Sequence, residues 1–138
     1  MKIAIINGPN LNLLGTREVD VYGTETFDAY FEELKKKFQQ VEFNYFQSNV
    51  EGELINEIQR IGFSFDGIVF NPGGYTHTSV AIGDAIAAIK TKVIEVHISN
   101  IFCREDFRKI SHISGKSIGV ISGLGLKGYT LAVEYFVG

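Results

Sequence analysis

The stretch VIEVHISN, residues Val93 to Asn100, begins as a buried strand and ends in polar residues. Three of its first four residues are branched and apolar, which is typical of a strand covered on both faces. Glu95 interrupts this run and His97 follows two places later, and residues two apart in a strand point to the same face. A carboxylate and an imidazole therefore share one side of an element that should otherwise be dry.

Two further apolar runs lead into polar clusters in the same way. Ile3–Ile6 precedes NGPN, residues 7–10, and Gly67–Phe70 precedes NPGGYTHTS, residues 71–79. Segments with apolar residues at three- and four-residue steps, typical of amphipathic helices, separate the strands. We expect helices over residues 27–38, 48–61, 79–89 and 129–137, and further strands over residues 41–46 and 118–121. Ser48 and Glu51 stand three apart, which is the spacing of a capping box.

Strands that alternate with helices at this spacing predict a parallel sheet, because each parallel crossover needs a long connection. The expected class is α/β, a flavodoxin-like three-layer sandwich with five parallel strands and helices on both faces. The 138 residues suit a single domain spanning 1–138. Ligands in such sheets bind beyond the carboxyl ends of the strands. The three polar clusters should therefore meet at one rim of the sheet.

Composition and charge exclude several classes of partner. The net charge is −3, and the basic run Lys35–Lys37 fits the solvent face of a helix, so nucleic acid is not expected. A single cysteine, Cys103, allows no intrachain disulfide and no cysteine-based zinc site, which indicates a reducing compartment. The first apolar stretch ends at Ile6, too soon for a signal peptide or a membrane span. We expect a soluble cytoplasmic protein without a membrane partner.

Two features suggest acid and base chemistry. A carboxylate such as Glu95 that accepts from one nitrogen of His97 fixes the tautomer and raises the basicity of the other nitrogen. The alternative is a core histidine held by a salt bridge, and the position at the rim favours catalysis.

The long charged connection LGTREVDVYG, residues 14–23, is typical of a lid, and its Arg17 would favour the phenolate form of Tyr22. The alternative there is a surface loop whose tyrosine merely packs.

The cluster NPGGYTHTS offers amide, hydroxyl and imidazole groups around two glycines just before a helix. Backbone amides at a helix start attract anions, so a polyhydroxylated or carboxylated small molecule fits. A capped turn is the alternative, and it can coexist with binding.

Other patterns indicate structure more than chemistry. GLGLKG, residues 123–128, has dinucleotide-fingerprint spacing, but the ten residues after it leave no second strand for the acidic partner, so close packing at a helix start is expected. Cys103 beside Arg104 is expected to be a small hydrophobe rather than a thiolate nucleophile. His112 is expected at the surface, and no histidine spacing indicates a metal site.

Five motifs together resemble those of type II 3-dehydroquinate dehydratase, the small dehydroquinase of the shikimate pathway. They are NGPNLNLLGTRE with VYG, NPGGYTHTSVAIGDA, EVHISN, REDFR and GLGLKGY. They follow the family's order and spacing from Ile3 to the last helix. Any one motif would be weak, whereas five in order are highly specific.

The resemblance implies a lyase without cofactor or metal that converts 3-dehydroquinate to 3-dehydroshikimate and water through an enolate, by anti elimination. At the matching positions, Tyr22 is the base that takes the proton beside the ketone, and Arg17 holds it as the phenolate. His97 is the general acid for the departing hydroxyl and is oriented by Glu95. Asn10 positions a water against the enolate oxygen.

The resemblance also implies the substrate contacts. Asn71, His77 and Arg108 would bind the hydroxyls, and Ile98 and Ser99 would bind the carboxylate.

Family members assemble as dodecamers built from trimers, and Asp84 resembles a residue that reaches into a neighbouring subunit's site. The chain departs from the family pattern in three places. Val19 replaces a common proline in the lid, Gly83 replaces a frequent arginine before Asp84, and FRKISHIS replaces a more usual His-rich stretch.

Two rival functions can be stated from the residues alone. One is a flavodoxin-like binding module for a nucleotide or phosphate, which would leave Arg17, Tyr22 and Glu95 without a role. The other is a hydrolase that uses Ser79 or Cys103.

Overall fold

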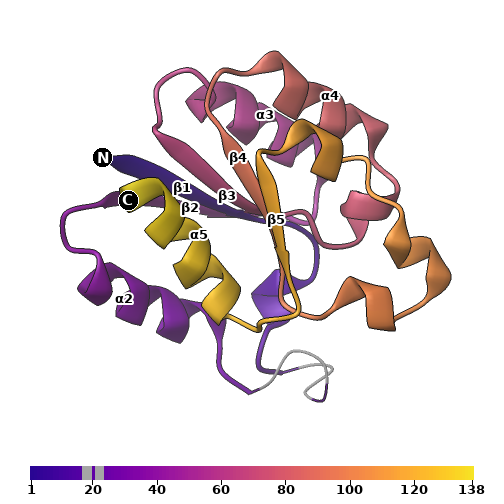
Figure 1. The fold of residues 1–138 in the computed structure, drawn as a ribbon, viewed down its shortest axis with the longest axis horizontal. Helices are drawn as coiled ribbons and strands as arrows, with labels where there is room; N and C mark the ends of the chain where they lie inside the picture. The colour runs from indigo at the N-terminus through magenta and orange to yellow at the C-terminus, as the bar shows by residue number, and fades with distance from the viewer. Residues whose placement is uncertain (17–19, 21–23) are drawn as a thin grey trace.

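The structure is a computed structural model that describes residues 1–16, 20 and 24–138. A sheet of five strands has helices on both faces (Figure 1). The strands lie in the order β2-β1-β3-β4-β5, and every neighbouring pair is parallel. The expected flavodoxin-like arrangement is therefore confirmed.

The observed elements fall within a few residues of the expected ranges. The strands are β1 (Lys2–Asn7), β2 (Glu42–Gln47), β3 (Gly67–Asn71), β4 (Val93–His97) and β5 (Gly119–Ser122). The α-helices are α2 (Phe27–Lys37), α3 (Glu51–Ile61), α4 (Val80–Ala88) and α5 (Lys127–Val137). Short 3₁₀ turns are η1 (Leu11–Leu13), η2 (Gly73–His77), η3 (Ile101–Cys103), η4 (Asp106–Lys109) and η5 (Ser114–Lys116).

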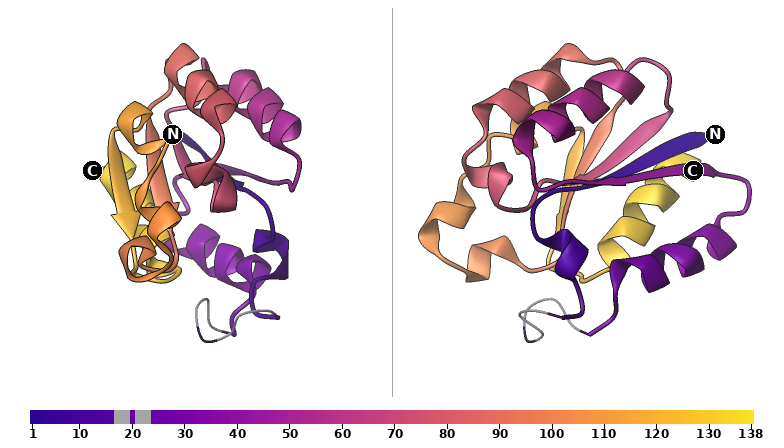
Figure 2. Two further views of the ribbon diagram at one scale, coloured as in Figure 1. Left: turned by 90° about the vertical axis from the view of Figure 1, so that its right-hand side faces the viewer. Right: turned by 180° about the vertical axis from the view of Figure 1, so that it is seen from behind.

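Two hydrophobic clusters fill the space on either side of the sheet. Alternate residues of β1 point to opposite faces, so Ile3 and Ile5 join one cluster whereas Ala4 and Ile6 join the other. The first cluster lies under α2 and α5, and the second lies under α3 and α4 (Figure 2). Every residue of β3 and β4 is buried, as expected of strands covered on both faces.

The capping box expected at Ser48 and Glu51 is wrong. Helix α3 begins at Glu51 with Val50 as its N-cap, so Ser48 lies two residues too early to cap it. The Ser48 hydroxyl instead accepts from the Val50 N–H and donates to Glu53, while Glu51 accepts from the hydroxyl of Ser79. The spacing was right for a box, but the helix begins two residues later than the box requires.

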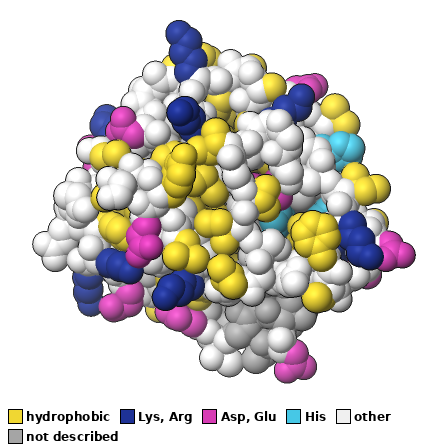
Figure 3. All heavy atoms as spheres, viewed as in Figure 1, with side chains coloured by type: hydrophobic (Ala, Val, Ile, Leu, Met, Phe, Trp, Pro, Cys, Tyr) yellow, Lys and Arg dark blue, Asp and Glu magenta, His cyan; other side chains and the backbone are white. Residues whose placement is uncertain are grey.

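Strand β5 lies at the edge of the sheet and pairs, among the described strands, with β4. Ile118, just before this strand, and Val120 within it are 46% and 44% exposed. The space-filling view shows hydrophobic side chains gathered over this part of the surface (Figure 3). Among the described helices, none combines the length and the hydrophobicity needed to cross a membrane.

Candidate active site

The polar clusters that follow β1, β3 and β4 lie at one end of the sheet, because parallel strands end on the same side. They line a pocket that is open to solvent and has a cavity volume of about 120 Å³. Seven of the residues expected at the site line it: Asn10, Asn71, His77, His97, Ile98, Ser99 and Arg108.

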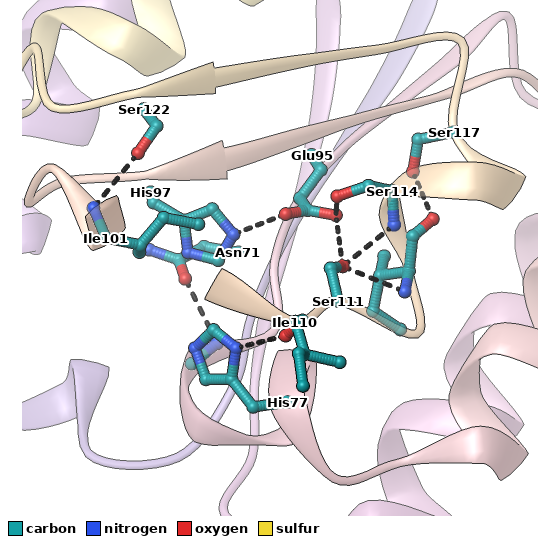
Figure 4. Close-up of polar contacts among 12 residues, drawn as sticks. Asn71, His77, Glu95, His97, Ile101, Ile110, Ser111, Ser114, Ser117 and Ser122 are labelled. Atoms are coloured by element: carbon teal, nitrogen blue, oxygen red, sulfur yellow. Dashed lines mark hydrogen bonds and ion pairs between the residues drawn. The ribbon is translucent and has the colours of Figure 1, made fainter. Parts of the chain in front are cut away.

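Glu95 and His97 point to the same face of β4, as their spacing predicts (Figure 4). Glu95 is completely buried, and the Nε2–H of His97 donates to Glu95 Oε2 at 2.5 Å. Because Nε2 is engaged with the carboxylate, Nδ1 is the nitrogen of His97 available to a ligand in the pocket. The pair is therefore arranged as a buried carboxylate that orients an imidazole at the pocket wall.

The second oxygen of Glu95 is held by two serines that the sequence did not single out. Ser114 Oγ donates to Glu95 Oε1 at 2.9 Å, and Ser111 Oγ donates to the same atom at 3.3 Å. Both serines belong to FRKISHIS, residues 107–114, which begins within η4 and ends at the first residue of η5. They lie 16 and 19 positions from Glu95 along the chain, so no local pattern connects them to the carboxylate.

His77 lies across the pocket, its ring centroid 6.3 Å from that of His97. Its Nδ1–H donates to the carbonyl oxygen of Ile110 at 2.7 Å. Burial lowers the pKa of His77 below its ordinary value of 6.5, and the nearby charges of His97 and Arg108 act in the same direction. His77 is therefore neutral at pH 7, with Nε2 left as a hydrogen-bond acceptor.

Two arginines line the pocket, although the resemblance assigned a role to Arg108 alone. The Arg108 guanidinium donates to both oxygens of Glu105, at 3.1 and 3.4 Å, which fixes its orientation. Arg104 donates from Nη1 to the Ser99 hydroxyl at 3.2 Å. Arg104 is the first residue of the motif REDFR, four positions before Arg108, and this spacing could have indicated a shared function.

Two asparagines form part of the pocket floor. Asn10 adopts a left-handed backbone, with φ of 71°, and its N–H donates to the Asn49 side chain at 3.0 Å. Asn71 is buried: its Nδ2 donates to the hydroxyl of Tyr129 at 2.9 Å, and its Oδ1 accepts from the Gly73 N–H at 3.1 Å. Tyr129, the last residue of the motif GLGLKGY, therefore fixes Asn71, a role that the sequence did not indicate.

Of the described residues expected at the site, two do not line the pocket: Glu95, which is buried and hydrogen-bonded to His97, and Asp84. Asp84 is exposed on α4. Arg17 and Tyr22 lie outside the described residues, so their expected roles stay predictions. Among the described residues, no cluster of three histidine, cysteine or acidic side chains is arranged to hold a metal ion.

The residues of the rival functions are placed elsewhere. Ser79 is buried as the N-cap of α4: its hydroxyl accepts from the Ile82 N–H, as the capped-turn alternative predicts. Cys103 is exposed on η3 and is not among the described lining residues. At the end of GLGLKG, a Cβ on Gly128 would lie 3.2 Å from the Val96 side chain, so the expected close packing at a helix start is confirmed.

Other proteins are similar to this chain in sequence and in fold. A 3-dehydroquinate dehydratase of Fusobacterium nucleatum is 54% identical over 142 residues, covering 99% of this chain and 97% of the relative. The crystal structure of type II dehydroquinase from Butyrivibrio crossotus is 46% identical with a TM-score of 0.96, covering 100% of this chain and 98% of that one. The type II dehydroquinase from Propionibacterium acnes is 37% identical with a TM-score of 0.90, covering 97% and 94%.

The family described as Dehydroquinase class II matches residues 1–137. Because this match spans nearly the whole chain and agrees with the sequence relatives and the solved structures, the chain belongs to the class II dehydroquinase family.

Proposed function

We propose that this chain converts 3-dehydroquinate to 3-dehydroshikimate and water, without a cofactor or metal, by anti elimination through an enolate. The observation that carries the proposal is the Glu95–His97 pair, which is buried at the wall of a pocket that also presents guanidinium groups. The substrate is suggested by relatives named 3-dehydroquinate dehydratase.

The first step removes the proton from the carbon beside the ketone. Tyr22 takes this proton as the phenolate, which Arg17 stabilises, and the electron pair moves to the ketone oxygen to form the enolate. This assignment rests on the lid motif LGTREVDVYG. It is supported by Leu11 of η1, which lines the pocket and stands three residues before the motif. Asn10, also at the pocket, positions a water against the enolate oxygen.

The second step expels the hydroxyl. His97 donates its Nδ1 proton to the leaving oxygen, the carbon–oxygen bond breaks, and the enolate collapses to the conjugated ketone. A positioned acid of this kind contributes about 10²- to 10⁴-fold to the rate. Glu95 stabilises the imidazolium that must form before each donation, since its carboxylate lies 2.5 Å from Nε2.

The polar walls of the pocket match a small hydroxylated acid. His77 accepts a hydrogen bond from one substrate hydroxyl through Nε2, because its Nδ1–H is already donated to Ile110. Arg108 and Asn71 bind further hydroxyls, and Ile98 and Ser99 bind the carboxylate. The guanidinium of Arg104 beside the Ser99 hydroxyl adds positive charge where that carboxylate would lie.

We also propose a homo-oligomer in the cytoplasm, a dodecamer of trimers in which Asp84 reaches a neighbouring site. Exposed hydrophobic side chains near the pocket support this assembly: Val80, Phe107 and Ile110 are 59%, 54% and 61% exposed in a single chain. A neighbouring subunit would cover them. Size-exclusion chromatography with light scattering tests this assembly, and a monomer at micromolar concentration would contradict it.

The test of the reaction is an ultraviolet assay in which 3-dehydroquinate is added to purified protein and the absorbance of the conjugated enone is followed. Tyr22→Phe and His97→Ala should each abolish turnover while circular dichroism shows an intact fold. Near-normal rates in either variant would contradict the assigned roles. Borohydride added with substrate should not inactivate the enzyme, and covalent trapping would indicate a Schiff-base route instead.

A further inference from the structure

The carboxylate of Glu95 has two kinds of partner, one on each oxygen. Oε2 faces His97, and Oε1 accepts from the hydroxyls of Ser111 and Ser114. The Ser111 oxygen already accepts from the N–H groups of Ile113 and Ser114, so its own hydrogen is directed to Glu95. The two hydroxyls therefore act as donors to a carboxylate that is 0% exposed.

A buried carboxylate is costly unless donors surround it, and these hydroxyls supply the donors on the side away from the histidine. With Oε1 held by two hydrogen bonds, the carboxylate has one orientation, in which Oε2 faces Nε2 of His97. The serines also stabilise the negative charge after His97 has given up a proton, when the imidazolium no longer balances it.

We propose that Ser114, with Ser111, is a positioning residue for proton donation by His97: it holds Glu95 so that the Nδ1 face of the imidazole is presented to the substrate. The inference rests on the proposed function of His97 as the general acid. No motif of the sequence analysis gave these serines a role.

The fold fixes the segment that carries the serines. Ile113 is completely buried in the cluster under α3 and α4, and the His112 N–H donates to the Thr76 carbonyl oxygen at 2.9 Å. Gly83 of α4 lets this segment approach closely, because a Cβ there would lie 2.4 Å from the His112 carbonyl oxygen. The serine hydroxyls are therefore held at Glu95 by packing rather than by a mobile surface loop.

Ser114 is the residue to test, because its hydroxyl has Glu95 as its described partner, whereas the Ser111 hydroxyl also closes a backbone turn. The variants are Ser114→Ala, Ser114→Thr and Ser117→Ala. Ser117 lies in the same segment, but its hydroxyl donates to the Ile113 carbonyl oxygen and not to Glu95. It is a matched control for losing a hydroxyl from this segment.

Ser114→Ala should lower kcat about tenfold, the lower end of what a hydrogen bond to a charged group contributes, with little change in KM. Ser114→Thr keeps the hydroxyl and should restore most of kcat. Ser117→Ala should retain the kcat of the unaltered protein. Proton NMR supplies a readout without turnover: the Nε2–H resonance of His97 should shift or broaden in Ser114→Ala and stay in place in Ser117→Ala. All the variants keep His77, whose ring centroid lies 6.3 Å from that of His97, and the pocket-lining Arg104 and Arg108.

An unchanged kcat in Ser114→Ala, or equal losses in Ser114→Ala and Ser117→Ala, would overturn the inference and leave the proposed function standing. If the unaltered protein did not dehydrate 3-dehydroquinate, the proposed function would fail by itself. The NMR comparison would then decide whether Ser114 positions the Glu95–His97 pair, and an unshifted resonance in Ser114→Ala would overturn that too.

Discussion

Replacing Glu95 with glutamine tests whether the buried carboxylate is needed as a charge or only as a shape. Three donors surround it: Nε2–H of His97 at 2.5 Å, Ser114 Oγ at 2.9 Å and Ser111 Oγ at 3.3 Å. Glutamine fits the same space, but it has one acceptor oxygen and one NH₂ group. The NH₂ group must therefore face either the serine hydroxyls, which would have to accept instead of donate, or Nε2, which would impose the opposite tautomer on His97.

The size of the effect follows from the loss of one charged hydrogen bond. Such a bond contributes about 1.5–3 kcal/mol. If it is lost in the transition state, kcat falls by about 10- to 150-fold. The loss of negative charge beside the imidazolium acts in the same direction, whereas KM should change little because Glu95 is not a lining residue of the pocket.

The assay is the ultraviolet measurement of enone formation at saturating 3-dehydroquinate. Glu57→Gln is the matched control, because Glu57 is also buried and hydrogen-bonded, but its partners are Arg60 and Asn44, and none of these three residues lines the pocket. Circular dichroism should show both variants folded. A kcat in Glu95→Gln equal to that of Glu57→Gln would refute the claim that the carboxylate charge serves His97.

Three other properties of the chain can be tested in the same way. Burial lowers the pKa of His77 from 6.5, so at pH values from about 6.5 down to the lowered pKa the unfolded state binds more protons than the folded state. The free energy of unfolding should therefore decrease as the pH is lowered through this range, and it should decrease less steeply in His77→Asn. Equal slopes in urea titrations of the two proteins would contradict this. Gly83→Ala places a Cβ 2.4 Å from the His112 carbonyl oxygen and should cost about 1–3 kcal/mol of unfolding free energy. Gly52→Ala, with open space around it, should instead stabilise by about 0.5–1 kcal/mol, and thermal unfolding that ranked the two variants the other way would count against the packing. Tyr129→Phe removes the hydroxyl that joins the buried side chains of Asn7 and Asn71. The free energy of unfolding, measured with urea, should decrease by about 1–3 kcal/mol for each polar group left unpaired. An unchanged urea midpoint would show that the hydroxyl is dispensable.

The sheet could be predicted because its strands carry a strong local signal. Runs of branched apolar residues such as Ile3–Ile6 and Gly67–Phe70 form strands buried on both faces, and parallel connections bring their polar ends to one rim. The Glu95–His97 contact was predictable for the same reason, since it needs only the two-residue period of a strand.

The rest of the site depends on contacts that no local pattern encodes. Ser111 and Ser114 look like ordinary loop residues until the fold brings them to Glu95. Tyr129 reaches Asn71 from 58 positions away. The capping box failed because spacing alone does not fix where a helix begins, and Ser48 bonded to an acid two residues beyond the expected one.

Hydrogen exchange at the carbon beside the ketone tests the division of work between base and acid most directly. 3-Dehydroquinate is incubated in D₂O with each variant, and deuterium in the recovered substrate is measured by NMR. If Tyr22 forms the enolate and His97 only expels the hydroxyl, His97→Ala should incorporate deuterium without giving 3-dehydroshikimate, whereas Tyr22→Phe should do neither. Exchange that persists in Tyr22→Phe, or dehydration that persists in His97→Ala, would contradict the account.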